Sequence, residues 1–202
     1  MQRSLSEYIE YHKIQINHML RDILRDLDIP QRLKDSMLYS VEAGGKRLRP
    51  ILMIASYEAY QEDVEKVYHT ACALEMIHTY SLIHDDLPAM DDDDFRRGKP
   101  TNHKMFDEAT AILAGDALLT YSFEIIANDP HLTDMQKVIL IKELSKASGP
   151  SGMVAGQLLD MEAENKSISL QALEHIHQLK TGALISFAVF AGAYLGQATA
   201  EQ

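Results

Sequence analysis

A short segment in the middle of the chain concentrates side chains that bind metal ions and phosphate groups. Between Asp85 and Arg97, six aspartates and two adjacent arginines follow an apolar stretch. Clustered carboxylates repel one another unless a cation lies among them. Mg²⁺ is usually held by one or two carboxylates together with phosphate oxygens of a substrate. The segment therefore predicts a site where a divalent cation joins protein carboxylates to a phosphorylated ligand, with the arginines as further anion ligands.

A second candidate segment runs from Gly44 to Pro50 and combines two glycines with three basic residues. Glycine lets the backbone approach a ligand closely, and fixed cations hold phosphate oxygens by charge-assisted hydrogen bonds. The segment is thus a candidate diphosphate cradle. A basic loop that follows a glycine helix cap explains it equally well when it is taken alone.

His78 precedes Asp85 by seven positions in an apolar helical stretch. On a helix this spacing places the two residues about 10 Å apart along the axis and within about 20° of each other around it. His78 could therefore face the same cavity as the first carboxylate. A packed core histidine is the simpler interpretation of the spacing alone, and a solvated acidic loop is the simpler interpretation of 92–94.

The composition is that of a globular chain without a basic nucleic-acid surface. The 202 residues are 46% hydrophobic, enough for one substantial core. The net charge of −11 argues against a general nucleic-acid binder. Cys72 is the single cysteine, which suits a reducing compartment. The longest apolar run, Ala183–Gly196, is shorter than the roughly 20 residues of a membrane span. We therefore expect a cytoplasmic protein without a membrane span.

The periodicity of apolar residues is helical nearly everywhere and predicts a single all-α domain. A capping box of Ser4 and Glu7 begins the first helix, which ends before Pro30. A polar loop is expected over 91–101, and no alternating strand pattern is present. The further predicted helices are 31–43, 50–61, 64–86, 103–128, a helix from the Thr133–Gln136 capping box to Ser148, 152–164 and 169–195.

Several motifs, in this order, resemble those of the trans-polyprenyl diphosphate synthases, in particular the bacterial farnesyl diphosphate synthases (geranyltranstransferases). The motifs are GGKRLRP at 44–50, HTYSLIHDDLPAMDDDD at 78–94, RRGKPT at 96–101, AGDAL at 114–118, GQLLD at 156–160 and KTGALI at 180–185. The resemblance implies a helical bundle of the isoprenoid synthase type with a central cavity between the helices.

The resemblance also implies a role for each matching residue. The pocket for the diphosphate of isopentenyl diphosphate would comprise Lys46, Arg49, His78 and Arg97. The Mg²⁺ ligands would be Asp85 and Asp91, with Asp86 in support, and Mn²⁺ could replace Mg²⁺. The allylic diphosphate would contact Arg96, Lys180 and Thr181, with Gln157 and Asp160 lining the same cavity. The catalytic set would be Asp85, Asp91, Arg96 and Lys180.

The implied reaction joins isopentenyl diphosphate to dimethylallyl or geranyl diphosphate and yields farnesyl diphosphate. Tyr80 lies five residues before Asp85, about 7.5 Å back along the helix. The resemblance implies that a bulky residue at that position forms the floor of the cavity and stops growth of the product at fifteen carbons. Ordinary helix packing also explains Tyr80. A homodimer is expected from the resemblance.

One part of the family pattern is missing from the sequence. The second aspartate-rich motif, which supplies further Mg²⁺ ligands, has no counterpart between Lys166 and Gln202. We therefore expect residues 1–202 to form a polyprenyl synthase domain that lacks its C-terminal third, and we expect this chain alone to turn over poorly.

Three other classes of function stay open at this point. A non-catalytic diphosphate-binding fragment or subunit would keep the basic pocket and make no product. A metal-dependent phosphohydrolase is suggested by His84-Asp85, but the other histidines show no ligand spacing. A calcium loop at 91–94 would need a glycine where Arg96 stands.

Overall fold

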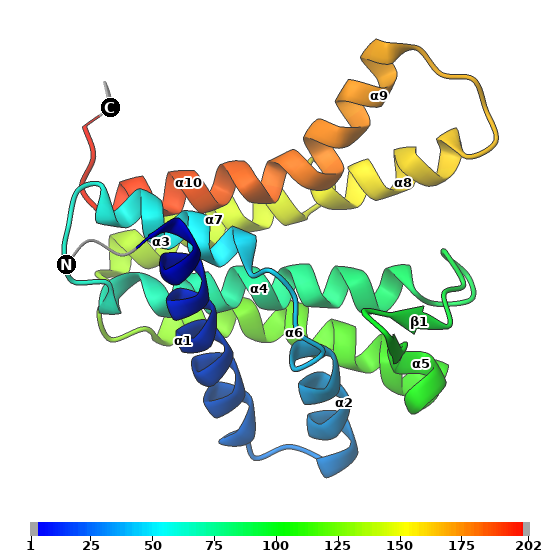
Figure 1. The fold of residues 1–202 in the computed structure, drawn as a ribbon, viewed down its shortest axis with the longest axis horizontal. Coiled ribbons are helices and arrows are strands. Elements are labelled where there is room, and N and C mark those ends of the chain that lie inside the picture. Colours follow the sequence, from blue (N-terminus) through cyan, green and yellow to red (C-terminus); the bar gives the residue numbers. More distant parts are fainter. Residues whose placement is uncertain (1–3, 200–202) are drawn as a thin grey trace. The chain divides into compact units, whose positions relative to one another are not determined.

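The computed structural model describes residues 4–199, which are mostly helical (Figure 1). The chain divides into two compact units. Unit 1 holds the chain through Ile51 together with Ala71–Ile125, and unit 2 holds Leu52–Thr70 together with Ile126 onward. The all-α prediction is confirmed, whereas the single, C-terminally incomplete domain stays a prediction.

Unit 1 begins with an antiparallel helix pair, α1 (Leu5–Arg25) and α2 (Gln31–Val41). The predicted capping box starts α1, because the Glu7 amide donates to Ser4 Oγ (3.3 Å) and the Ser4 amide donates to the Glu7 carboxylate (2.8 Å). α1 buries an i, i+4 stripe of apolar residues, and Pro30 precedes α2 at a position that suits its fixed φ. Buried residues of this stripe are Ile16, Leu20 and Leu24.

The central helix of unit 1 is α4 (Glu65–Asp85), which is buried on all sides over Ala71–Ile77. A helix that is apolar all round belongs in the middle of a core. Gly115 of α6 (Glu108–Asn128) contacts this helix, since a Cβ at that position would lie 2.2 Å from His84 Nε2. The absence of a side chain at Gly115 therefore lets α6 pack closely against α4.

The loop after α4 contains structure that the sequence did not predict. Two-residue strands β1 (Phe95–Arg96) and β2 (Lys99–Pro100) pair antiparallel. Arg97 and Gly98, between the strands, have φ of 54° and 77°. Two consecutive residues with positive φ are the signature of a type I′ hairpin turn. The hairpin therefore fixes the direction of the two arginines, which an open loop would not do.

The predicted helix 103–128 is two helices. The short α5 (Asn102–Met105) ends at Phe106, where the backbone leaves the helical region. Asp107 then accepts a hydrogen bond from the Thr110 amide (2.7 Å), as an N-cap does at the start of α6. The cap at Asp107 separates the two segments.

Unit 2 contains the rest of α3 (Leu48–Glu58) and the C-terminal helices. α7 (Asp134–Ser148) begins at the predicted capping box of Thr133 and Gln136. α8 (Met153–Ala163) follows and turns back through α9 (Leu170–His177), as the yellow and orange ribbons of Figure 1 show. α10 (Ala183–Leu195) packs on α7 and on α3, where Gly192 approaches the Met53 carbonyl.

The helix predicted over 169–195 is continuous but irregular. Between α9 and α10, the segment η1 (Gln178–Gly182) is π-helical. By length and hydropathy alone, α6 and the whole stretch Leu170–Leu195 meet the criteria for a membrane span, with 39% and 33% of their most apolar windows buried. Core helices of soluble proteins meet the same criteria, so the expectation of no membrane span stays a prediction.

Candidate active site

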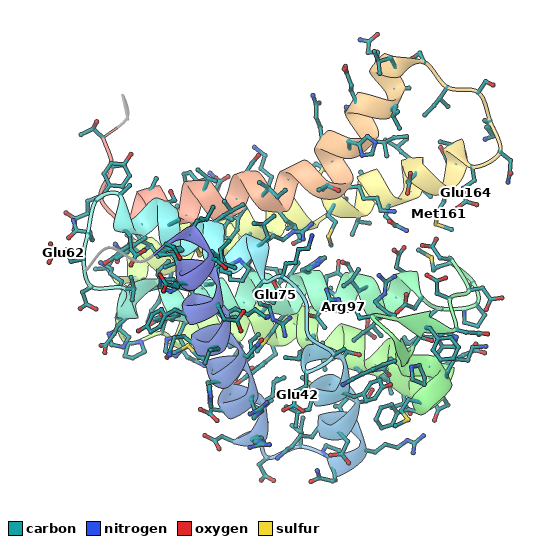
Figure 2. All side chains as sticks on the ribbon, viewed as in Figure 1. Glu42, Glu62, Glu75, Arg97, Met161 and Glu164 are labelled. Atoms are coloured by element: carbon teal, nitrogen blue, oxygen red, sulfur yellow. The ribbon has the colours of Figure 1, made fainter. Side chains whose placement is uncertain are left out.

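A cavity of about 540 Å³ in unit 1 collects the residues predicted to bind isopentenyl diphosphate. It opens between the loop 43–49, the middle of α4 and the hairpin turn. Glu75 and Arg97, both labelled in Figure 2, line this cavity. Predicted residues on its wall are Lys46, Arg49, His78 and Arg97.

The loop that forms one wall has a backbone that needs glycine. Gly44 and Gly45 have φ of 86° and 134°, and Arg47 has φ of 50°. A left-handed conformation at a residue with a Cβ is unfavourable by about 1–2 kcal/mol. A Cβ on Gly45 would also lie 2.5 Å from Arg97 Nη1. The two glycines therefore allow both the turn and the approach of the Arg97 guanidinium.

Arg49 and His78 are joined across the cavity by a contact of 3.2 Å between Arg49 Nη1 and His78 Nε2. Burial lowers the pKa of His78 to about 3, and the positive charges of Arg49 and Arg97 contribute to the shift. His78 is therefore neutral at physiological pH. Because a guanidinium only donates, Nε2 accepts and Nδ1 carries the proton. The positive charge of this wall comes from Arg49, Lys46 and Arg97.

The carboxylates of the acidic segment are separated by the fold into two groups. The Asp91 amide donates to the Asp85 carbonyl (2.9 Å), and the Asp92 amide donates to the Leu87 carbonyl (3.1 Å). These bonds close the turn of residues 87–90 and bring Asp91 back beside Asp85 at the end of α4. Asp85 is half-buried and Asp91 is exposed.

The Asp86 carboxylate forms the second group, because it makes an ion pair with Arg96. Arg96 Nε lies 2.8 Å and 3.0 Å from the two carboxylate oxygens, and Nη2 lies 2.6 Å from Oδ1. Asp86 is buried while Arg96 is half-buried. Burial raises the pKa of the Asp86 carboxyl, and the bond from Arg96 opposes that shift. The pair fixes the direction of the guanidinium, which was predicted to contact the allylic diphosphate.

The predicted Mg²⁺ ligands Asp85 and Asp91 are carboxylates, the donor type that Mg²⁺ prefers. Among residues 4–199, no three acidic, histidine or cysteine side chains form a cluster that could hold a metal ion. A carboxylate pair is nevertheless the usual protein contribution where substrate phosphates and waters complete the shell. The donor set therefore suits Mg²⁺ carried with a diphosphate, and Mn²⁺ accepts the same oxygen ligands.

Tyr80 is 6% exposed and lies on α4 between His78 and Asp85. Its ring makes an edge contact with His84, with the ring centroids 5.7 Å apart. His84 Nε2 in turn lies 3.0 Å from the Ile112 carbonyl. These contacts hold the Tyr80 ring in place, whatever its role in product length.

Unit 2 brings together the motifs at 156–160 and 180–185. Lys180 Nζ lies 2.5 Å from Asp160 Oδ2. A Cβ on Gly156 would lie 2.2 Å from the Lys180 backbone nitrogen, so glycine is what lets α8 and η1 touch. Thr181 is exposed and Gln157 half-buried. Short π-helical segments are frequent at functional sites, and this one carries Lys180 and Thr181.

Sequence reasoning missed Glu75 and gave no role to Arg47. Arg47 Nη1 donates to Glu75 Oε1 at 2.8 Å, and both side chains are almost fully buried. The signal in the sequence was a charged residue inside the otherwise apolar run 71–77, because a carboxylate buried there needs a partner.

Comparison with known proteins places this geometry in a class of enzymes. The fold matches a solved FPP/GFPP synthase from Zymomonas mobilis with a TM-score of 0.90 and 43% identity, covering 96% of this chain and 71% of that one. A geranyltransferase from Legionella pneumophila matches with a TM-score of 0.87 and 42% identity, over 94% and 68% of the two chains. The fold is thus that of the isoprenyl diphosphate synthases.

The sequence matches the polyprenyl synthetase family over residues 30–202. Farnesyl diphosphate synthase of Geobacillus stearothermophilus is 50% identical over the whole of this chain and 68% of that protein. Geranylgeranyl diphosphate synthase of Cyanophora paradoxa is 52% identical over 84% of this chain and 57% of that protein. The chain belongs to the polyprenyl synthetase family, whose members are prenyltransferases of isoprenoid biosynthesis.

Proposed function

We propose that the protein condenses isopentenyl diphosphate with an allylic diphosphate and releases farnesyl diphosphate. The observation that carries this proposal is the basic cavity on the face of α4, with His78 on its wall about 10 Å along the helix from the Asp85–Asp91 pair. One helix thereby presents a metal-free anion pocket and a metal-binding edge. Two diphosphates bound in this way would place their hydrocarbon parts together.

The charge of each side chain determines its proposed role in binding the two substrates. Lys46, Arg49 and Arg97 bind the diphosphate of isopentenyl diphosphate, with His78 orienting Arg49. Asp85 and Asp91, with Asp86 in support through Arg96, hold Mg²⁺ on the allylic diphosphate. When bound, Mg²⁺ neutralises charge that develops on the departing diphosphate. Arg96 donates to the same group, and the family resemblance assigns Lys180 and Thr181 to it as well.

The proposed reaction breaks the allylic C–O bond, and the diphosphate leaves with its electron pair. The double bond of isopentenyl diphosphate attacks the allylic carbon, a new C–C bond forms, and a proton is lost to the released diphosphate. Fixed donors lower the barrier because they are oriented before charge develops. Holding both substrates converts a two-body encounter into a step within one complex.

The test is a condensation assay with isopentenyl and geranyl diphosphates, with and without Mg²⁺. Farnesyl diphosphate should appear only with Mg²⁺, and Asp91→Asn should lower its rate by about 100-fold or more, as expected when a charge-stabilising group is removed. A chain that binds isopentenyl diphosphate by calorimetry and forms no product would select the non-catalytic diphosphate-binding fragment instead. A chain that binds neither diphosphate would refute both.

Geranylgeranyl diphosphate is a second candidate product, because some relatives are named for its synthesis. Geranylgeranyl diphosphate synthases of Cyanophora paradoxa and Capsicum annuum are 52% and 46% identical to this chain. We propose the fifteen-carbon product because Tyr80 is buried and fixed by His84, where it would block a growing chain. Tyr80→Ala should lengthen the product by at least one isoprene unit, as read by mass spectrometry, while Tyr80→Phe should keep fifteen carbons. Unchanged length in Tyr80→Ala would remove Tyr80 from this role.

The remaining expectations are part of the same proposal. The substrates would be isopentenyl diphosphate with dimethylallyl and geranyl diphosphates. A cytoplasmic homodimer without nucleic-acid partners is proposed from the family and from the net charge of −11.

A further inference from the structure

The basic loop at 44–50 contains three cations that have different surroundings. Lys46 is exposed and Arg49 half-buried, and both line the cavity. Arg47, between them in the chain, also lines the cavity, but its side chain is only 1% exposed. A side chain with so little accessible surface cannot bind a substrate in the way its neighbours can.

Arg47 is held by three acceptors from three different segments. Its Nε donates to Asn17 Oδ1 of α1 (2.8 Å), its Nη1 donates to Glu75 Oε1 of α4 (2.8 Å), and its Nη2 donates to the Val41 carbonyl at the end of α2 (2.5 Å). The planar guanidinium presents donors in a fixed fork, and lysine cannot reproduce that arrangement. Arg47 therefore connects the basic loop to three helices at once.

The three contacts of Arg47 stabilise an unfavourable backbone conformation at the same residue. Its φ of 50° is unfavourable for a residue with a side chain, and such conformations persist where the surroundings over-determine them. The left-handed residue turns the chain between Lys46 and Arg49. Without the three contacts, the turn would relax and the two flanking cations would lose their common direction.

Glu75 serves the same pocket in two ways. It neutralises Arg47, so that Lys46, Arg49 and Arg97 remain as the cations available to a diphosphate. It also lies three residues before His78, on the same face of α4, and His78 contacts Arg49. The loop and the histidine are thereby positioned by one rigid helix.

We propose that Arg47 and Glu75 are positioning residues of the isopentenyl diphosphate pocket, which hold the turn at 44–49 so that Lys46 and Arg49 face the diphosphate, and that neither touches the substrate. This inference rests on the proposed function, because it assumes that the cavity binds isopentenyl diphosphate.

The experiment measures the Kd of isopentenyl diphosphate by calorimetry, without allylic substrate or Mg²⁺, on the 202-residue chain. Arg47→Lys keeps the charge and loses the fork, so binding should weaken roughly tenfold, which is the effect of about one charge-assisted hydrogen bond. Asn17→Ala removes one of the three contacts and should weaken binding about threefold. Arg21→Lys is the matched control, because Arg21 of α1 pairs with Glu42 at the exposed end of α2 (2.6 Å); its Kd should equal that of the wild type.

A double-mutant cycle separates positioning from direct binding. In a Lys46→Gln/Arg49→Gln background, Arg47→Lys should add less than about twofold, because the cations it positions are gone. An additive tenfold loss would make Arg47 a ligand and overturn the proposal. A merely structural role would weaken Mg²⁺-dependent binding of geranyl diphosphate as much as binding of isopentenyl diphosphate, and would also overturn it.

Two further outcomes are informative. If Arg47→Lys does not fold by circular dichroism, Asn17→Ala decides, and an unchanged Kd in that variant refutes the proposal. If the wild type binds no isopentenyl diphosphate, the proposed function fails. Wild-type binding that Arg47→Lys leaves intact refutes only this inference.

Discussion

At the scale of single residues, the neutral His78 and the charged Arg49 have different roles in the basic cavity. His78 was predicted from the family resemblance as a diphosphate ligand, and it lies on the cavity wall. Its neutrality makes it a hydrogen-bond acceptor toward Arg49 and a donor through Nδ1. The guanidinium therefore supplies the charge, and the imidazole supplies its direction. That role for His78 depends on burial, which can be tested by pH.

The low pKa of His78 should make folding stability depend on pH. Histidine titrates near 6.5 in an unfolded chain, and burial together with the nearby guanidiniums lowers the pKa of His78 to about 3 in the folded protein. Between these values the unfolded state binds a proton that the folded state does not, so stability falls as pH falls from 6.5 toward 3. His78→Gln should lose less free energy of unfolding between pH 7 and pH 4.5 than the wild type.

Urea unfolding across this pH range measures the effect. The same substitution at exposed His18 of α1 controls for the loss of one histidine, and its stability curve should run parallel to that of the wild type. Parallel curves for His78→Gln and the wild type would mean that His78 is not buried in its neutral form.

At the scale of elements, the contact between α8 and η1 places Lys180. Gly156 has no room for a side chain, because a Cβ would lie 2.2 Å from the Lys180 nitrogen and 2.6 Å from its Cα. Both atoms belong to the backbone, so no rotation of a side chain relieves the clash. The position of Lys180 beside Asp160 therefore depends on a glycine one helix away.

Gly156→Ala should destabilise the protein by about 1–3 kcal/mol, the usual range for overpacking. Gly182→Ala, in the same π-helical segment, is the matched control, since its Cβ would lie 3.5 Å from the His177 carbonyl, an ordinary contact. That variant should not lose stability. Guanidinium unfolding compares the two, and equal stabilities would show that α8 and η1 are not packed as closely as described.

At the scale of the whole molecule, the sequence predicted where helices occur but not where a helix is interrupted or becomes π-helical. The boundaries near Ser4, Pro30 and Gly149 follow from caps and prolines, which act locally. The break before α6 was missed although Asp107 and Thr110 form an N-cap pair, because the apolar pattern continues across it. The π-helical turn at 178–182 is a shift of backbone hydrogen bonds, and such a shift changes the spacing of apolar residues in the sequence very little.

In the candidate site, the sequence likewise identified the residues of the motifs but not the contacts between distant segments. The family motifs identified Lys46, Arg49, His78 and Arg97, and the structure brings all four to one cavity. The partner of Arg47 could not be predicted, because Glu75 is 28 positions away and only the packing of α4 brings it there. The pairing of Asp86 with Arg96 depends on the hairpin turn, where the positive φ of Arg97 is uncommon for a residue with a side chain.

The position of Asp85 beside Asp91 at the end of α4 leads to a prediction about coupled binding. Asp85 and Asp91 alone offer too few ligands for a tight magnesium site, whereas a diphosphate adds oxygens and removes repulsion between the carboxylates. Ligands that bind only the folded state stabilise it by about 2.7 kcal/mol at 100 times their Kd. Mg²⁺ alone should therefore raise Tm little, and Mg²⁺ with inorganic pyrophosphate should raise it by more than the two separate shifts combined.

Thermal unfolding with each ligand, and with both together, measures this coupling. Asp91→Asn should abolish the excess shift, because it removes one of the two carboxylates, while Lys46→Gln should leave most of the excess, because Lys46 faces the metal-free pocket. A shift by Mg²⁺ alone as large as that by the pair would indicate a metal site complete within the protein. Strictly additive shifts would mean that the acidic edge of α4 does not bind a metal–diphosphate complex, and the proposed reaction would lose its means of activating the leaving group.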